Sequence, residues 1–261
     1  MARPPKEPST AVTTPKSTLP AAMAEEMARE VAALASRLAK PSGDRITITK
    51  AGTFKTPDNQ ELESLEAIVL DFVSMNAYYD KPYAPGKIDP PVCFAIGLEP
   101  GALVPSPNSP EVQSETCASC WANQFGSHPN PNRKGKACTN NKLLALLPPD
   151  ADANTTIQVL KVPTTSIKNF DGYVGSVARA FQRPVRAVIT EITSDASIEW
   201  ENAKFGNPVP CDKTQLILAY NRKAEAMKRL MVEPDIAAMQ DQSKPATPAR
   251  KPAARGKSAR S

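Results

Sequence analysis

The segment Cys117–Lys142, CASCWANQFGSHPNPNRKGKACTNNK, limits what this chain can fold into more than any other part of the sequence. It holds three of the five cysteines of the 261-residue chain and its only histidine. Proline, glycine, asparagine and charged residues dominate it, so its few apolar residues cannot form a core. A loop of this kind folds most readily around a divalent ion, because metal ligation supplies the free energy that burial cannot.

The cysteine spacing predicts a tetrahedral metal site. Cys117 and Cys120 form a CxxC pair, which lets two thiolates bind one ion through a tight turn. Cys138 follows 18 residues later as a third ligand. The fourth is either His128, inside the loop, or Cys93, in the apolar segment PPVCFAIG, and sequence order leaves both open. Closed structural sites of this kind usually hold Zn²⁺, whereas four cysteines also suit an iron–sulfur cluster.

A redox-active or incidental CxxC pair is the simpler alternative for the same cysteines. A CxxC pair alone is weak evidence for a metal, but a third cysteine and a nearby fourth donor strengthen it. Cys211 stands apart in NPVPCDK and is interpreted as an unliganded thiol. The sequence shows no apolar run long enough to span a membrane and no secretory signal. We therefore expect a cytoplasmic protein, in which thiols stay reduced.

Composition separates a folded middle from polar ends. Residues 1–20 are rich in proline, serine and threonine and are expected to be disordered. Residues 21–40 carry apolar side chains at helical spacing, which predicts an amphipathic helix. Residues 237–261 carry six lysines and arginines and one acidic residue, which predicts a basic disordered tail. Such a tail suits a salt-dependent contact with nucleic acid, or simply keeps the protein in solution.

The middle of the chain predicts one globular domain over residues 44–236, with a cysteine-rich metal loop at 111–141. Its short apolar and β-branched runs predict strands at 44–54, 62–79, 90–99, 142–149 and 155–163 and a hairpin over 183–206. Helical patterns lie at 163–181 and 212–231. This arrangement favours an α+β fold: a mainly β small barrel of the oligonucleotide-binding (OB) type, with a metal-binding loop insertion, one internal helix and terminal helices. An open α+β sheet is the alternative.

The blocks PPVCFAIG…CASCWANQFGS…RKGKACTNNKLLALLP, LKVPTTSIKNFDGYV and RAVITEI resemble a poorly characterised family of phage and mobile-element proteins. Its members share a C…CxxCxxNxxGS…GKxC pattern, then an apolar strand and a P[TP][TS]xxKxFxxY helix. The resemblance covers about residues 44–205. It implies single-stranded-DNA binding in phage replication or recombination. Because the family's first cysteine falls on Cys93, it also implies the ligand set Cys93, Cys117, Cys120 and Cys138.

Recognition of a single strand needs cationic groups along the phosphates and aromatic rings for the bases. The segment NAYYDKPYAPGK and the cysteine loop both combine them. The candidate nucleic-acid-binding residues are Tyr79, Lys81, Trp121, Arg133, Lys134 and Lys136. We expect single-stranded DNA as the partner, with replication or recombination proteins as further partners, in the cytoplasm of a bacterial host cell. We expect no membrane partner.

Motifs of catalysis do not occur in the sequence. It contains no GxSxG, no GxxxxGK[ST] and no glycine-rich dinucleotide turn, and His128 is not followed by the glutamate of the zinc deaminases. Four cysteine ligands would also leave a metal no open position for chemistry. We therefore expect a protein without enzymatic activity. The alternative function is a metal-stapled interaction module, whose helix at 21–40 and basic tail recruit replication or transcription machinery.

Overall fold

The structure of the protein is a computed structural model that describes residues 44–81, 89–130, 132 and 134–243, together with Met23, Glu26, Met27, Arg29 and Glu30. Those five residues belong to a first unit, residues 1–43, and the others to a second unit, residues 44–261. All five are helical and exposed. The rest of the predicted helix at 21–40, the segment 1–20 and the tail from residue 244 lie outside the described residues.

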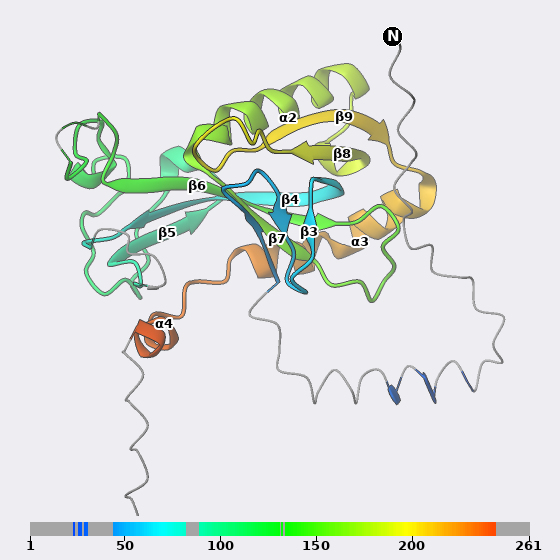
Figure 1. Cartoon of the computed structure of the whole chain (residues 1–261), viewed down its shortest axis with the longest axis horizontal. Helices are drawn as coiled ribbons and strands as arrows, with labels where there is room; N and C mark the ends of the chain where they lie inside the picture. The colour runs from blue at the N-terminus through cyan, green and yellow to red at the C-terminus, as the bar shows by residue number, and fades with distance from the viewer. Residues whose placement is uncertain are drawn as a thin grey trace, which may run out of the picture. The chain divides into compact units, whose positions relative to one another are not determined.

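The second unit has a mixed α+β fold, in which few helices accompany a sheet curled into a half-barrel (Figure 1). The predicted α+β class is confirmed at this level. The strands are β1 (Arg45–Ile48), β2 (Phe54–Lys55), β3 (Glu61–Leu62), β4 (Ser64–Tyr78), β5 (Cys93–Gly97), β6 (Cys138–Leu147), β7 (Gln158–Val162), β8 (Val188–Thr193) and β9 (Lys204–Pro210). The α-helices are α2 (Ile167–Phe181), α3 (Lys213–Leu230) and α4 (Ile236–Ser243). The short 3-10 helices are η1 (Pro100–Ala102), η2 (Trp121–Asn123), η3 (Thr164–Ser166) and η4 (Val185–Ala187).

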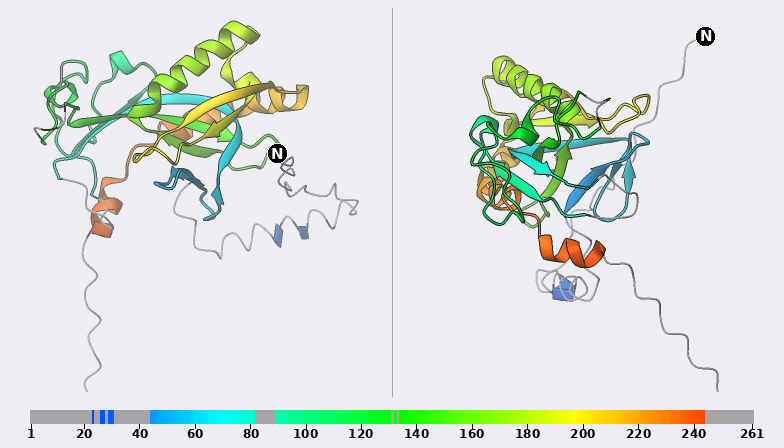
Figure 2. Two further views of the ribbon diagram at one scale, coloured as in Figure 1. Left: turned by 45° about the horizontal axis from the view of Figure 1, so that its top comes forward. Right: turned by 90° about the vertical axis from the view of Figure 1, so that its left-hand side faces the viewer.

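The 15-residue strand β4 is the centre of the sheet. Along one edge it pairs antiparallel with β6. Along the other edge residues 64–68 pair with β8 and residues 74–78 pair with β5. The strand order is β3-β2-β1-β7-β6-β4-β8-β9, and among the described strands only β1 and β7 run parallel. Because β4 has different partners at its two ends, it connects the helix-covered part of the sheet with the cysteine-rich end (Figure 2).

Both faces of the sheet are apolar because a helix covers each of them (Figures 1 and 2). In β6 the side chains alternate: Leu144 and Leu146 join the core that contains α2, whereas Leu143, Ala145 and Leu147 join the core that contains α3. A strand buried on both faces has a continuous apolar sequence. The run LLALL, residues 143–147, follows from this double coverage.

The internal helix predicted at 163–181 is present as α2, preceded by η3. Ser166 lies at its start, but its hydroxyl does not cap the helix. Instead, Ser166 Oγ accepts a hydrogen bond from the N–H of Ala203 at 2.7 Å and is buried. The helix ends where Gln182 adopts a left-handed conformation with φ 53°. The serine therefore connects α2 to the chain just before β9.

The final predicted helix is present as α3, and its first turn is stabilised by a reciprocal capping pair. Asp212 Oδ1 accepts from the N–H of Gln215 at 2.8 Å, while Gln215 Oε1 accepts from the N–H of Asp212 at 2.9 Å. This capping box satisfies two N–H groups that have no partner within the helix. The local sequence DKTQ thus marks the start of α3, and Gln215 Nε2 also donates to the carbonyl of Pro149 at 2.9 Å.

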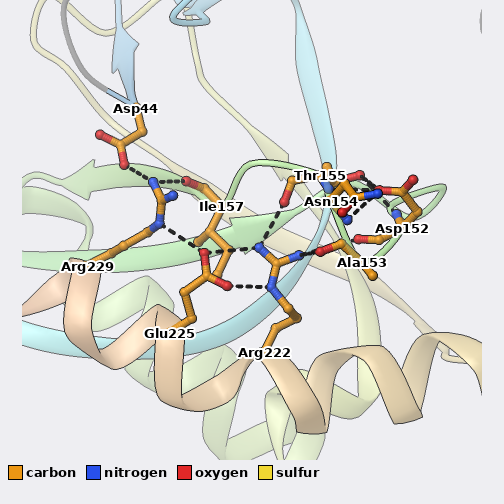
Figure 3. Close-up of polar contacts among 9 residues, drawn as sticks. All are labelled: Asp44, Asp152, Ala153, Asn154, Thr155, Ile157, Arg222, Glu225 and Arg229. Carbon is orange, nitrogen blue, oxygen red and sulfur yellow. Dashed lines mark hydrogen bonds and ion pairs between the residues drawn. The ribbon is translucent and has the colours of Figure 1, made fainter. Parts of the chain in front are cut away.

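Two arginines hold α3 against the loop before β7 and the start of β1 (Figure 3). Arg222 donates to the backbone carbonyls of Ala153 at 2.9 Å and Thr155 at 3.0 Å. Arg229 lies about two helical turns further along α3 and pairs with Asp44. Because a guanidinium group presents several fixed donors, one side chain satisfies two carbonyls that the loop leaves unpaired.

The hairpin predicted at 183–206 is present as β8 and β9, but its second strand begins later than expected. Residues 194–203 form a loop that Asn202 closes. Its Oδ1 accepts from the N–H of Asp195 at 2.9 Å and its Nδ2 donates to the carbonyl of Asp195 at 3.0 Å. The segment SIEWEN, residues 197–202, was predicted to pair as a strand, but it belongs to this loop instead. β9 instead includes Pro208 and Pro210, which suit a strand at the edge of a sheet.

Helix α4 occupies residues 236–243, whereas the sequence predicted that the basic disordered tail begins at residue 237. Asp235 precedes it, and Asp235 Oδ1 accepts from the N–H of Ala238 at 2.9 Å, which is the bond of a helix N-cap. Throughout the described residues, no helix combines the length and the apolar character needed to cross a membrane.

Candidate metal centre

Cys93 and Cys138 each begin a strand that flanks the end of β4. Cys93 pairs with Tyr78 on one edge, and Cys138 pairs with Tyr78 on the other. Residues in register on neighbouring strands point to the same face of a sheet. Both thiols therefore lie on the face of Tyr78, with their backbones separated by two strand spacings, or about 10 Å.

Cys117 and Cys120 reach the same region from the loop between β5 and β6. The N–H of Cys117 donates to the carbonyl of Leu103 at 2.9 Å, and the side chains of Cys117 and Leu103 pack together. Cys120 packs with Ala122 and Cys138. The CxxC turn is thus fixed at one cysteine by the backbone of the preceding loop and at the other by the first residue of β6.

One pocket is lined by all four cysteines that the sequence singled out as ligands. Its other lining residues are Asn76, Tyr78, Phe94, Ala95, Pro105, Gln113 and Asn123. Each of the four thiols is at most 9% exposed, and none is in a disulfide. In the part of the chain that the structure describes, no three histidine, cysteine, aspartate or glutamate side chains are arranged to hold a metal ion. The fold thus brings the four cysteines to one pocket without showing a coordination geometry.

His128 is not among the residues that line this pocket. The ring Nδ1 of His128 accepts a hydrogen bond from the backbone N–H of Asn130 at 3.0 Å. The backbone N–H of His128 donates to the carbonyl of Gly135 at 3.3 Å. The imidazole therefore takes part in a turn of its own loop, residues 117–138, which we call the cysteine knuckle. This geometry favours Cys93 over His128 as the fourth donor, a choice that sequence order left open.

Burial and neighbouring cysteines raise the pKa of two thiols in the pocket, Cys138 and Cys117. Burial, together with the neighbouring Cys117, Cys120 and Cys93, raises the pKa of Cys138 from 9.0 to about 12. Burial also raises the pKa of Cys117, although a hydrogen bond with the Asn76 side chain acts in the opposite direction. A cation that enters the pocket must displace these protons, because the ligand is the thiolate.

Three asparagines form a hydrogen-bond network beside the pocket. Asn140 Nδ2 donates to Asn76 Oδ1 at 2.6 Å and to Asn123 Oδ1 at 3.0 Å. Asn123 Nδ2 donates to the carbonyl of Cys117 at 2.8 Å. Lys136 Nζ donates to Asn123 Oδ1 at 3.1 Å. These amides connect the sheet, the CxxC turn and the basic segment that leads into β6.

Two aromatic rings of the knuckle are exposed. Trp121 is 51% exposed, meets the ring of Tyr78 edge-on at 5.4 Å between centroids and donates from Nε1 to Gln113 Oε1 at 3.3 Å. Phe125 is 83% exposed, and Lys136 Nζ lies 5.1 Å from its ring centroid. The knuckle therefore combines aromatic surface with positive charge next to the cysteine pocket.

The other predicted nucleic-acid-binding residues lie at this end of the sheet or outside the described chain. Tyr79 directly follows β4 and is 39% exposed, and Lys81 comes two residues later and is exposed. Lys134 is an exposed residue of the knuckle. Arg133 lies outside the described residues. Tyr79 and Lys81 thus lie just beyond the end of β4, where Cys93 and Cys138 flank Tyr78.

The sequence did not indicate the polar row that continues from the pocket along β6. Asn140 and Lys142 follow Cys138 at spacings of two residues, so all three side chains point to one face of the strand. Lys142 is buried and pairs with Asp171 of α2. Polar residues at every second position after a candidate ligand are the signal that could have identified this row.

Comparison of the chain with known proteins identifies no family, since no family model, no curated protein and no solved structure matches it.

Proposed function

We propose that the protein binds single-stranded DNA during phage DNA replication or recombination, without catalysing a reaction. A Zn²⁺ ion held by Cys93, Cys117, Cys120 and Cys138 would stabilise the knuckle that makes the contact. The observation that carries this proposal is the presence of exposed aromatic rings and lysines on a loop anchored by four buried, unbridged cysteines. The sequence resemblance implies the same function.

The donor set suits zinc. Four thiols line one pocket, none is in a disulfide, and Zn²⁺ accepts four thiolates in a closed structural site. The Asn76 side chain, which hydrogen-bonds Cys117, would orient that ligand, as groups around metal sites commonly do. The same thiols suit an iron–sulfur cluster, and elemental analysis of the purified protein separates the two.

The surface around the pocket offers both components of single-strand recognition. Trp121 and Phe125 expose ring surface on which bases can stack, and Lys136 supplies positive charge beside Phe125. Tyr79 and Lys81 add a second aromatic and basic pair at the end of β4. The curled, mainly antiparallel sheet beneath them supports an OB-type barrel as the underlying fold.

Fluorescence anisotropy of a labelled oligo-dT tests this proposal. The full chain is titrated beside a chain that ends at Ser243 and so lacks the basic tail, with single-stranded and duplex DNA, over a range of salt concentrations. We expect both proteins to prefer the single strand, with a logarithmic salt slope of about 0.7 for each phosphate contacted. Binding that disappears with the tail, or that does not distinguish the two DNAs, would exclude the proposed function.

A metal-stapled interaction module is the second candidate, and one observation favours it. Met23 and Met27 are helical residues four positions apart, and they are 51% and 49% exposed. Two exposed methionines at this spacing present an apolar surface that a protein partner can cover. In this case residues 21–40 would recruit replication or transcription machinery, and the chain that ends at Ser243 would not bind DNA.

A further inference from the structure

We infer that Phe125 and Lys136 form one nucleotide-binding unit of the knuckle, in which a base of a single strand stacks on the phenyl ring and the adjoining phosphate meets the ammonium group. Asn123 is the positioning residue of this unit. The inference rests on the proposed single-strand binding and names the residues that perform it.

Phe125 has an open ring face. Its side chain is 83% exposed, and the ammonium group of Lys136 lies over the ring at 5.1 Å from the centroid. One face is therefore occupied by the cation, while the other is open to solvent. So exposed a phenylalanine contributes little to folding, because it removes almost no apolar surface from water. Any base can stack on such a face, since every base has a π-face.

Lys136 is held in place before a ligand arrives. Its ammonium group donates to Asn123 Oδ1 at 3.1 Å and contacts the ring of Phe125. An ammonium group has three donors, so the bond to Asn123 leaves others for a phosphate oxygen. Because the side chain is already ordered, binding loses less conformational entropy than it would with a free lysine.

Asn123 connects this pair to the cysteine pocket. Its Oδ1 accepts from both Lys136 and Asn140, and its Nδ2 donates to the carbonyl of Cys117 at 2.8 Å. Asn123 is also one of the residues that line the pocket. A shift of Cys117 therefore moves the amide that holds Lys136. If a metal binds in the pocket, this one side chain would couple metal binding to nucleotide binding on the knuckle.

The first test measures oligo-dT binding by the full chain and by Phe125→Ala, Lys136→Ala and the double variant. Phe125→Ala should weaken binding about 5- to 150-fold, the range found when a stacking ring is removed, and leave the salt slope unchanged. Lys136→Ala should lower the slope by about 0.7. The double variant should lose less than the product of the two single losses, because both groups act on one nucleotide.

Lys161→Ala is the matched control, because it removes an equal charge from an exposed position on β7. Its affinity should stay within about twofold of the unaltered chain. Asn123→Ala tests the positioning role. It should weaken binding, and Lys136→Ala added to it should have little further effect. Zinc content and melting temperature should stay close to those of the unaltered chain.

The outcomes separate the inference from the proposed function. If the unaltered chain does not bind oligo-dT, the proposed function is wrong and the inference falls with it. If it binds but Phe125→Ala and Lys136→Ala behave like Lys161→Ala, the inference alone is wrong. Multiplicative losses in the double variant would show two separate contacts rather than one unit. Loss of zinc together with binding in Asn123→Ala would assign Asn123 a structural role instead.

Discussion

Lys142 Nζ lies 5.1 Å from the ring centroid of Phe72, at a position where the lysine is only 7% exposed. The ring centroid of Phe170 lies 5.6 Å from the same ammonium group, and Asp171 of α2 pairs with that group while remaining about half exposed. The apolar stem of the lysine thus occupies core space, and its charge meets a carboxylate near the surface.

We expect Asp171→Ala to destabilise the protein more than Lys142→Met. Removing the carboxylate leaves a nearly buried cation unpaired, which we expect to cost about 2 kcal/mol, below the usual cost of breaking a buried pair because Asp171 is half exposed. Lys142→Met keeps the apolar stem and leaves Asp171 in water, at a cost below about 1 kcal/mol. Urea denaturation of both variants shows which of them has lost more stability. The reverse order would mean that packing of the lysine stem, not its charge, matters here.

The purified chain should contain about one Zn²⁺ ion. Serine at any one of the four pocket cysteines should remove stoichiometric zinc and lower the melting temperature, because in the proposed site the ion holds the knuckle together. Cys211→Ser is the matched control, since Cys211 is 6% exposed but lies in the core under α3. Elemental analysis and thermal denaturation, with and without a chelator, report the result. Zinc that survives Cys93→Ser but is lost in His128→Ala would make the histidine the fourth ligand.

The stability of the protein should fall at alkaline pH in part through Cys211. Burial, with a further contribution from Asp212, raises the pKa of Cys211 from 9.0 to about 11. Between these values the folded state keeps a proton that the unfolded state has lost. The contribution of Cys211 to the free energy of unfolding is therefore complete below the unfolded-state pKa of 9.0, and it is lost as pH rises through the folded-state pKa of about 11. Urea denaturation on both sides of this interval should show a smaller decrease for Cys211→Ala. Equal decreases in the two proteins would contradict this assignment.

Alanine at Gly52 should be more destabilising than alanine at Gly126, although both glycines have positive φ, 76° and 87°. A Cβ at Gly126 would meet nothing within 4 Å, whereas one at Gly52 would lie 2.9 Å from backbone atoms of Ala196. Gly126→Ala should cost about 1 kcal/mol from left-handed strain alone. Gly52→Ala should cost at least about 2 kcal/mol, because the loop backbone must move as well. Thermal denaturation compares the two variants. Equal losses of stability would show that the backbone of the loop at 194–203 moves to accommodate the added Cβ at little cost.

Local periodicity was sufficient to predict β4, α2 and α3, because each follows a strong pattern over many residues. The order of strands could not be predicted, since β1 pairs with β7 and β4 with β8 across more than 100 residues of sequence. The later start of β9 has a similar reason. It depends on the Asn202 side chain closing a loop, a contact that a strand-like pattern does not reveal.

The spacing of Cys117, Cys120 and Cys138 was sufficient to predict that they lie close together, and in the structure they line one pocket. Whether Cys93 or His128 joins them depends on the register of β5 against Tyr78, which no local pattern encodes. The exposure of an aromatic ring is likewise a property of the folded loop. The knuckle sequence therefore could not show how fully exposed Phe125 is.

The position of Tyr78 between two cysteine-bearing strands also bears on the order in which the chain assembles. β4, β5 and β6 are complete at Leu147, whereas α3 ends only at Leu230. Because synthesis and folding proceed from the N-terminus, the cysteine end can form while the chain is still emerging from the ribosome. The face that α3 later covers is then open and apolar. Capture of an ion by the nascent chain would keep its central strands aligned until the covering helix arrives.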